Sequence, residues 1–435
     1  MTENLPQTPE VPVWARDDAF PQAPAGWGWL DTKGKSQVCD SLDALTAAIR
    51  EDPDASVTLV WAPSHLRMVL PEELEGMGDA LRIARARWAR NDLANATLKL
   101  RGGSLLLAGL SIYTFYPNLK LAERLAVTSG LTPDLLAGFK FASTALLRSN
   151  SCGLGLLVFV IFAFIPWYQA RKRQIELGTW TEAGIAKAAP AIRFETWLDR
   201  QKSPVTRVLL GLITLVALAQ VLFKIKTDGW SSLLSLLQHW DGTAAAGLIK
   251  DRYQQGEWWR LFTAPWLHGN LLHFLMNVAA LAYLGKRLEV FARWPHLPMV
   301  FLFAATLGGE ASARWVSATS VGASGGLMGC LGFLLVFETL HARLVPRRAR
   351  RRLAGGVLLT AVIGLIGYRL IDNAAHAGGL LAGMFYAAIV FPASASPNRP
   401  RTTHTDLFVG SAALAILSAA AFFTIYQIME TKASL

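Results

Sequence analysis

Val-Gly-Ala-Ser-Gly-Gly-Leu-Met-Gly-Cys-Leu, residues 321 to 331, is the stretch from which the fold of this chain is inferred. It places Ser324 at the start of an apolar segment that continues as Gly-Phe-Leu-Leu-Val-Phe. The residues around this serine that lack side chains are Gly322, Gly325, Gly326 and Gly329. Their absence of side chains lets another helix backbone approach the hydroxyl closely. Ser324 is therefore a candidate nucleophile, and a plain helix contact with an incidental serine is the alternative.

The composition is that of a membrane protein. Of the 435 residues, 52% are hydrophobic and only 17% are charged, so we expect much of the chain to lie in lipid. The net charge of +11 is concentrated in basic clusters beside apolar segments, which is typical of positive-inside topology. Because no aromatic stacking motifs lie between these basic residues, nucleic-acid binding is not expected.

The cysteines and the N-terminal residues exclude other classes of protein. Cys39, Cys152 and Cys330 have no metal-ligand spacing, and we expect no disulfide framework. The first ten residues lack a basic start followed by an apolar core, and no cleaved signal peptide is predicted. The simplest location is a bacterial inner membrane.

The N-terminal quarter of the chain predicts a small soluble unit. Residues 1–26 are rich in Pro, Ala and acidic residues and are expected to be disordered. Residues 27–100 predict an α+β unit with a strand at Gly26 to Asp31, a helix over Leu42 to Arg50 and a strand at Val57 to Trp61. A basic helical segment, Leu81 to Arg101, then leads to the membrane.

Nine apolar segments follow, and we interpret them as membrane spans of an all-α polytopic protein. They are Ser104 to Tyr116, Gly153 to Tyr168, Val205 to Phe223, Leu271 to Leu288, His296 to Gly309, Val321 to Phe337, Leu353 to Leu370, His376 to Phe391, and Leu407 to Ile428. If the basic segment before Ser104 is cytoplasmic, nine alternating spans put all the later basic clusters on the same side. Residues 205–393 then form a six-helix core, residues 101–204 add two spans, and residues 394–435 add a linker and one more.

Three polar groups in these segments coincide near the outer surface. His273 and Asn277 stand four residues apart and share one helix face, and His376 begins a helix with small residues. A serine hydroxyl needs a base to accept its proton, and His376 is the natural base for Ser324. His273, Asn277 and the Ser324 N–H can donate hydrogen bonds to the oxyanion of acyl transfer. Because no carboxylate is obviously placed to orient His376, with Asp372 a weak candidate, we predict a Ser–His dyad.

With these residues in view, residues 205–393 resemble the six-helix core of the rhomboid intramembrane serine proteases. The motifs that carry the resemblance are Glu257-Trp-Trp-Arg, His268-x4-His273-x3-Asn277, Gly285 to Glu289, Gly322-Ala-Ser-Gly, and Ala375-His-Ala-Gly-Gly-x3-Gly. The resemblance implies that Ser324 is the nucleophile, that His376 is its base, and that His273 and Asn277 line the oxyanion hole. It also implies that Trp259 and Arg260 belong to a structured external loop. The substrates implied are the transmembrane segments of other membrane proteins, with no metal or cofactor.

Met328 departs from the family pattern, because the fourth residue after the serine is commonly aromatic and stacks on the catalytic imidazole. A thioether also packs against a ring edge, so we expect the dyad to survive. The main alternative is a catalytically silent rhomboid-like protein that binds or escorts membrane proteins. Such proteins typically lose the serine or the histidine, whereas this chain keeps both. A transporter is a third class, but it would need charged residues at mid-membrane, and the core segments have few.

Overall fold

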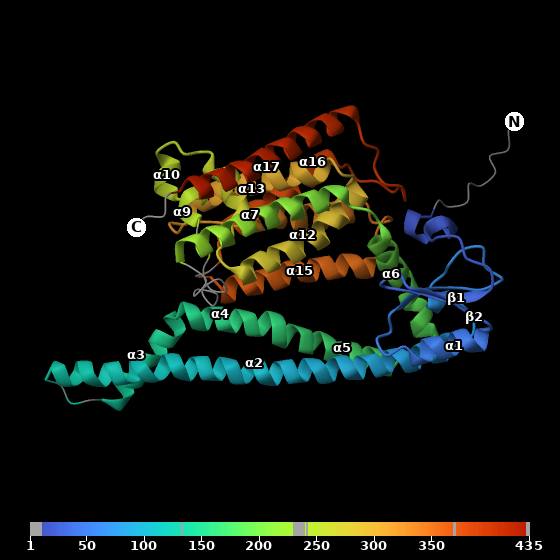
Figure 1. The fold of residues 1–435 in the computed structure, drawn as a ribbon, viewed down its shortest axis with the longest axis horizontal. Coiled ribbons are helices and arrows are strands. Elements are labelled where there is room, and N and C mark those ends of the chain that lie inside the picture. The colour runs from blue at the N-terminus through green and yellow to red at the C-terminus, as the bar shows by residue number, and fades with distance from the viewer. Residues whose placement is uncertain are drawn as a thin grey trace. The chain divides into compact units, whose positions relative to one another are not determined.

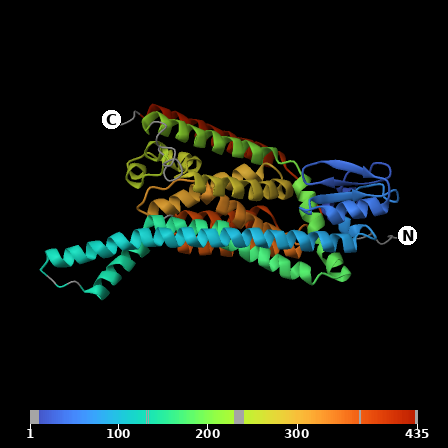
Figure 2. The same cartoon turned by 60° about the horizontal axis from the view of Figure 1, so that its bottom comes forward.

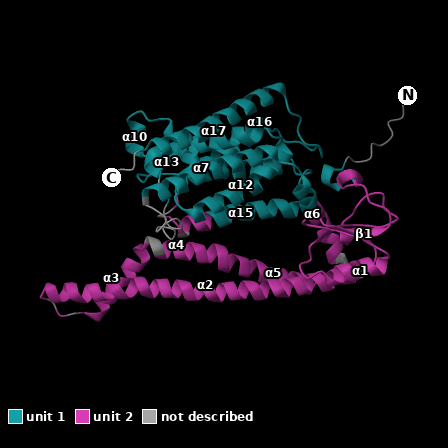
Figure 3. Cartoon of the chain, viewed as in Figure 1, with its two compact units in different colours: residues 1–16, 194–360, 372–435 teal, residues 17–193, 361–371 magenta. Residues whose placement is uncertain are grey.

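The computed structural model describes residues 11–130, 132, 134–228, 240, 242–368 and 371–431. The chain divides into two compact units, coloured in Figure 3. Unit 1 comprises Met1–Arg16, Phe194–Thr360 and Asp372–Leu435, and unit 2 comprises Asp17–Arg193 and Ala361–Ile371. All four residues predicted to form the catalytic site belong to unit 1.

Unit 1 is a helical bundle (Figure 1). Its helices are α7 (Pro204–Asp228), α9 (Thr243–Ala246), α10 (Lys250–Gln254), α11 (Arg260–Thr263), η6 (Ala264–Trp266), α12 (Leu271–Ala292), α13 (His296–Trp315), α14 (Ser324–Leu340), α15 (Arg347–Ile366, whose last residues belong to unit 2), α16 (Asn373–Val390) and α17 (His404–Glu430). Helices α13, α14 and α16 pack closely on one another. Around them, α7 packs on α12 and α17, and α13 also packs on α17.

The close packing of α14 on α16 depends on glycine. A Cβ atom on Gly379 would overlap the Gly325 carbonyl oxygen, and one on Gly383 would overlap the Gly329 carbonyl oxygen. The two backbones are therefore in direct contact along more than one turn, as the small-residue spacing predicted. This contact brings the first turns of α14 and α16 together.

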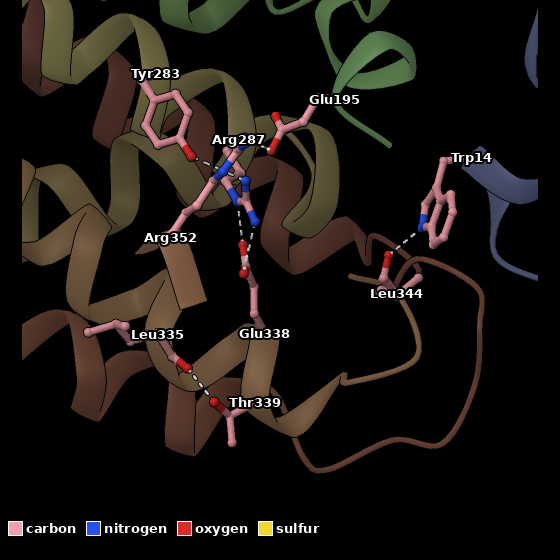
Figure 4. A network of polar contacts seen from close by, with 9 residues as sticks. All are labelled: Trp14, Glu195, Tyr283, Arg287, Leu335, Glu338, Thr339, Leu344 and Arg352. Carbon is pink, nitrogen blue, oxygen red and sulfur yellow. Dashed lines mark hydrogen bonds and ion pairs between the residues drawn. The ribbon is translucent and has the colours of Figure 1, made fainter. Parts of the chain in front are cut away.

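Buried polar groups join α12 to α14 and α7. The Arg287 guanidinium of α12 donates two hydrogen bonds, of 2.5 and 3.0 Å, to the Glu338 carboxylate of α14, and both side chains are almost fully buried (Figure 4). Two residues further along α12, Glu289 accepts the Val205 and Thr206 backbone N–H groups at 3.1 and 2.8 Å. Glu289 thereby caps the first turn of α7, whose N–H groups have no partner within their own helix.

Residues near the N-terminus also join unit 1. Trp14, in a short 3-10 helix over Val13–Ala15, donates its indole N–H to the Leu344 carbonyl at 2.7 Å (Figure 4). A second 3-10 helix covers Asp17–Ala19, at the start of unit 2. Residues 11–26 thus have defined structure where the sequence predicts disorder, while residues 1–10 of the expected tail lie outside the described residues.

Within the described residues, four helical segments are long and apolar enough to cross a membrane: Cys152–Gly178, Pro204–Thr227, Asn373–Val390 and His404–Glu430. A fifth arises if Arg260–Trp266 and Leu271–Ala292, which meet at 94°, count as one span, and α14 is a shorter apolar helix. The predicted segments at 104–116, 296–309 and 353–370 fall on α2, α13 and α15, which are not among these candidates. The structure thus supports four to five spans by length and composition, where the sequence predicts nine.

Unit 2 contains the small sheet and a helical hairpin. Strands β1 (Trp27–Asp31), β2 (Ser36–Cys39) and β3 (Val57–Trp61) form an antiparallel sheet in the order β2-β1-β3, and α1 (Leu42–Glu51) begins at the Ser41 cap. A 3-10 helix, η3 (Pro71–Glu73), precedes the hairpin. The two predicted strands and the predicted helix are present, and β2 is additional.

The hairpin of unit 2 is longer than the sequence predicts. Its helices are α2 (Gly78–Thr128), α3 (Leu135–Arg148), α4 (Asn150–Phe159), a π-helical turn (Val160–Phe164) and α5 (Ile165–Gly178), with α6 (Glu182–Arg200) leading into unit 1. Figures 1 and 2 both show α2 beside α5. The predicted basic helix and first apolar segment are one 51-residue helix that continues through Pro117. Asn118, next to the proline, donates its side-chain amide to the Thr114 carbonyl at 2.7 Å.

Candidate active site

Ser324 is the first residue of α14. It lies just after a turn that is held by backbone hydrogen bonds to other segments of the chain. Gly322 has a φ of 119°, a backbone conformation that side-chain-bearing residues rarely adopt. Its N–H donates to the Ala264 carbonyl at 2.9 Å, and Ser320 and Leu248 exchange two backbone hydrogen bonds. The serine is half-buried, so its hydroxyl is held at a defined place without being sealed from its surroundings.

His273 and Asn277 lie on α12 against this same turn. A Cβ atom on Gly322 would come within 2.5 Å of His273 Cε1 and 3.5 Å of Asn277 Nδ2. Both side chains therefore touch the backbone two residues before Ser324. The α12 N-terminus is fixed by Asn270, whose side chain accepts the His273 N–H at 2.9 Å.

The Asn277 side-chain amide is placed to donate a hydrogen bond. Asn277 is 5% exposed, and its Nδ2 atom has no hydrogen-bond partner within the described part of the chain. A buried N–H without a partner carries a desolvation cost, so such groups are rare and call for an explanation. One explanation is that this N–H is kept free to donate a hydrogen bond to an oxyanion that forms during a reaction.

His376 lies in the first turn of α16. Its backbone N–H donates to the Asp372 carbonyl at 3.1 Å, and the Asp372 carboxylate accepts the Ala375 N–H at 2.9 Å. A Cβ atom on Gly325 would lie 3.6 Å from the Ala375 carbonyl oxygen, so the residues after Ser324 and before His376 are neighbours. The four predicted residues therefore gather around one turn.

The dyad is not closed by a hydrogen bond. No hydrogen bond among the described residues joins Ser324 Oγ to the His376 imidazole, and none joins that imidazole to the Asp372 carboxylate. Catalytic hydrogen bonds are often long in a free enzyme and tighten when substrate binds. The carboxylate of Asp372 instead accepts hydrogen bonds from Ser312, Ser320 and the Ala375 N–H, and the Ser–His dyad stays a prediction.

His268 shapes one wall of the site without a polar partner. Its side chain is fully buried, its ring centroid lies 5.1 Å from that of His273, and neither ring nitrogen has a partner in the described residues. The Gln220 side chain of α7 holds the His268 backbone, accepting its N–H at 2.9 Å and donating to its carbonyl at 3.0 Å. The His268 ring thus contacts the rings of His273 and Phe274.

Arg260 organises the segment over residues 243–266 through buried contacts. Its guanidinium is buried, donates to the Gly247 and Ala245 carbonyls at 2.8 and 3.2 Å, and lies over the Trp259 ring. The Trp259 ring in turn contacts Phe423 of α17. Arg260 and Trp259 thus hold the segment that supplies Leu248 and Ala264 to the Ser324 turn.

Sequence reasoning did not connect a set of buried and half-buried polar residues beside the site, although it weighed Asp372 as an orienting acid. Lys250, Ser312, Ser320 and Asp372 form one hydrogen-bonded cluster. They come from four separate segments, so no local spacing links them. The one available signal was the charge of Lys250 directly after the apolar residues Leu248 and Ile249. Among the residues that the structure describes, no group of three or more His, Cys, Asp or Glu side chains is arranged to hold a metal ion.

Comparisons with known proteins place this site within a shared domain. Residues 255–393 match the rhomboid domain family. The chain is 36% identical over 138 residues to the rhomboid protease GluP of Bacillus subtilis (strain 168), which covers 31% of this chain and 26% of that protein. It is 35% identical over 134 residues to RHOMBOID-like protein 6, mitochondrial, of Arabidopsis thaliana, over 30% of this chain and 43% of that protein.

A relative named as inactive also matches. The chain is 29% identical over 140 residues to inactive rhomboid protein 1 of Papio anubis, over 31% of this chain and 16% of that protein. The matched segment thus covers less than half of each of these three relatives.

Proposed function

Because residues 255–393 form a rhomboid domain, we propose that this chain is an intramembrane serine endopeptidase that cleaves the transmembrane segments of other membrane proteins. The observation that carries the proposal is the convergence of α12, α14 and α16 on the turn at Gly322. Ser324, His376 and His273 lie in the first turns of α14, α16 and α12, and Asn277 lies one turn further along α12. No single helix supplies more than two of them.

The residues at this turn support acyl transfer. Ser324 Oγ attacks the carbonyl carbon of the scissile peptide bond while His376 accepts the hydroxyl proton. Asn277 Nδ2, His273 and the Ser324 backbone N–H stabilise the resulting oxyanion. When the C–N bond breaks, His376 gives its proton to the leaving amine. A water molecule, deprotonated by His376, then releases the acyl group and restores Ser324.

The wider setting follows from the same proposal. Residues 205–393 serve as a six-helix core within nine spans, with the site near the outer face of a bacterial inner membrane. Substrate segments that unwind easily, through small or helix-breaking residues, are favoured because attack needs an exposed peptide carbonyl. The proposed chemistry requires neither metal nor cofactor.

A binding or escort protein is the alternative, and the similarity to inactive rhomboid protein 1 is the observation that favours it. The two readings differ in whether Ser324 reacts. A fluorophosphonate labels an activated serine and leaves an unactivated one untouched.

The experiment therefore combines labelling with cleavage of a reporter membrane protein. We expect the wild-type protein to be labelled and active, and Ser324→Ala and His376→Ala to lose both properties while remaining folded. Ser317→Ala and His404→Ala, which alter exposed residues away from the turn, serve as matched controls. Cleavage that persists in either dyad variant, or a wild-type protein that is never labelled, would refute the proposal.

A further inference from the structure

A buried ammonium group lies beside the proposed site and takes no part in the chemistry described above. Lys250, in the short helix α10 of the external loop, is 6% exposed. Its Nζ atom donates to Ser312 Oγ at 2.8 Å, to Ser320 Oγ at 2.7 Å and to the Leu248 carbonyl at 3.3 Å. An ammonium group has three donors, and all three are satisfied here.

The two hydroxyl groups pass this interaction on to a carboxylate. Ser312 and Ser320 both donate to Asp372 Oδ2. The other carboxylate oxygen of Asp372 accepts the Ala375 N–H at 2.9 Å and caps α16. Lys250 and Asp372 are therefore a charge pair bridged by two serines, and we call these four residues the Lys250 network.

Each member of the Lys250 network comes from an element that also positions the site. Ser320 lies four residues before Ser324 and is paired with Leu248 of the external loop. Asp372 lies four residues before His376 and accepts that residue's backbone N–H through its carbonyl. Ser312 belongs to α13, which packs on both α14 and α16. The network thus joins the nucleophile's turn to the helix that carries the base.

We propose that Lys250 is a positioning residue for hydrolysis: by holding Asp372 through Ser312 and Ser320, it fixes the start of α16 and so sets His376 opposite Ser324. This inference rests on the function proposed above. Lys250 touches neither Ser324 nor His376 in the described hydrogen bonds, so it acts through the backbone of α16 and the turn before α14. A misplacement of about 1 Å at a catalytic group costs on the order of 100-fold in rate.

The charge of Lys250 matters because it is desolvated. Burial lowers the pKa of Lys250 to about 8, and the Asp372 carboxylate partly opposes this shift. From α13 the nearest ionisable groups are Glu310, which accepts the Tyr253 hydroxyl, and Arg314, which pairs with Glu310. On α10 itself, Asp251 and Arg252 are exposed. Asp372 is thus the charged group whose interaction Lys250 gains or loses.

The sign of the pH dependence follows. Below about pH 8 Lys250 is protonated and balances Asp372, so the network is complete. As the pH rises through that value the ammonium group loses its proton, and the half-buried Asp372 carboxylate is left without its counter-charge. We therefore expect the rate of hydrolysis to fall on the alkaline side, whereas a histidine base alone would keep its rate there.

The experiment measures kcat and KM on the reporter substrate, the rate of fluorophosphonate labelling of Ser324, and the thermal midpoint. We expect Lys250→Met to lower both kcat and the labelling rate by about 10- to 100-fold with KM changed less than twofold. Lys250→Arg keeps the charge at all accessible pH values, and we expect it to retain activity and lose the alkaline decline. Arg252→Met removes a positive charge from the same helix and is the matched control.

Several outcomes would overturn the inference. Unchanged kcat in folded Lys250→Met would do so. The double variant Lys250→Met/Asp372→Asn gives a second test. If it recovers kcat and the thermal midpoint together, the loss in Lys250→Met is one of stability, and the inference fails. If Lys250→Met does not fold, the pH dependence decides. The inference fails if the hydrolysis rates of the wild type and Lys250→Arg fall in the same way on the alkaline side. If the wild type is labelled and Lys250→Met has the same kcat and labelling rate, this inference alone is refuted. If the wild type is not labelled, the proposed function and this inference are refuted together.

Discussion

At the scale of single residues, the site depends on one glycine that contributes no functional group. Gly322 combines a φ of 119° with a backbone that touches His273 and Asn277. Any side chain at this position would meet the His273 ring and strain the turn. Two physical reasons therefore require glycine at position 322: its backbone conformation and the closeness of the His273 imidazole.

Gly322→Ala should therefore abolish cleavage. The added Cβ atom would lie 2.5 Å from His273 Cε1, so the imidazole or the turn must move. We expect the cleavage rate to fall by 100-fold or more. Gly269→Ala is the matched control, since a Cβ atom there meets nothing within 4 Å. Equal activity of the two variants in a reporter assay would contradict this account of the turn.

Asn277→Ala tests the unpartnered amide. Removing one oxyanion donor typically lowers kcat by about 100- to 1,000-fold, so we expect a loss of that order with little change in KM. The Nδ2 atom has no other partner among the described residues, so its removal should leave the thermal midpoint nearly unchanged. A variant that keeps the wild-type kcat would exclude Asn277 from the oxyanion site.

At the scale of elements, the contact between α14 and α16 sets how close the dyad can come. Carbonyl oxygens of Gly325 and Gly329 occupy the space where Cβ atoms on Gly379 and Gly383 would stand. This contact needs no side-chain chemistry, so its sequence signature is only the spacing of small residues.

Gly383→Ala should accordingly force the two helices apart. We expect the thermal stability to fall by about 1–3 kcal/mol, the usual cost of overpacking, together with slower labelling of Ser324. Gly211→Ala, on α7, is the control, because a Cβ atom there faces open space. A Gly383→Ala protein as stable and as reactive as Gly211→Ala would show that the helices do not depend on this contact.

The elements also show why some features were predictable and others were not. His273 and Asn277 lie four residues apart on one helix, and Gly379 and Gly383 do so on another, so helical periodicity alone places each pair. The predicted strands and the helix beginning after Ser41 follow from local alternation and capping in the same way. The roles of these residues in catalysis remain predictions until the variants are measured.

The features that could not be predicted from the sequence depend on long-range contacts or on weak local signals. The Lys250 network joins residues as far apart as Lys250 and Asp372, and Glu289 finds its partners on α7. Strand β2 is short and largely exposed, and it is identified only by its pairing with β1. The predicted apolar segment ends at Tyr116, just before Pro117, yet α2 continues through this proline.

At the scale of the whole molecule, the proposed topology places the Ser324 turn outside and the connection between α14 and α15 inside. Single cysteines in a background without the native ones test this. A membrane-impermeant maleimide should label Ala318→Cys in intact cells, and Ala342→Cys only after the membrane is opened, since both positions are exposed. The reverse pattern would contradict the orientation.

The lengths of the two central helices bear on the lipid around them. Helix α14 has 17 residues and α16 has 18. At a rise of 1.5 Å per residue they extend about 25 and 27 Å, less than the roughly 30 Å of a typical hydrocarbon layer. In the proposed topology both helices cross the membrane, so we expect the bilayer to thin around them and its headgroups to come closer to Ser324. The length of the lipid acyl chains would then set the depth of the Ser324 hydroxyl in the hydrocarbon layer. Shorter chains would relieve the mismatch, and longer chains would bury the hydroxyl more deeply.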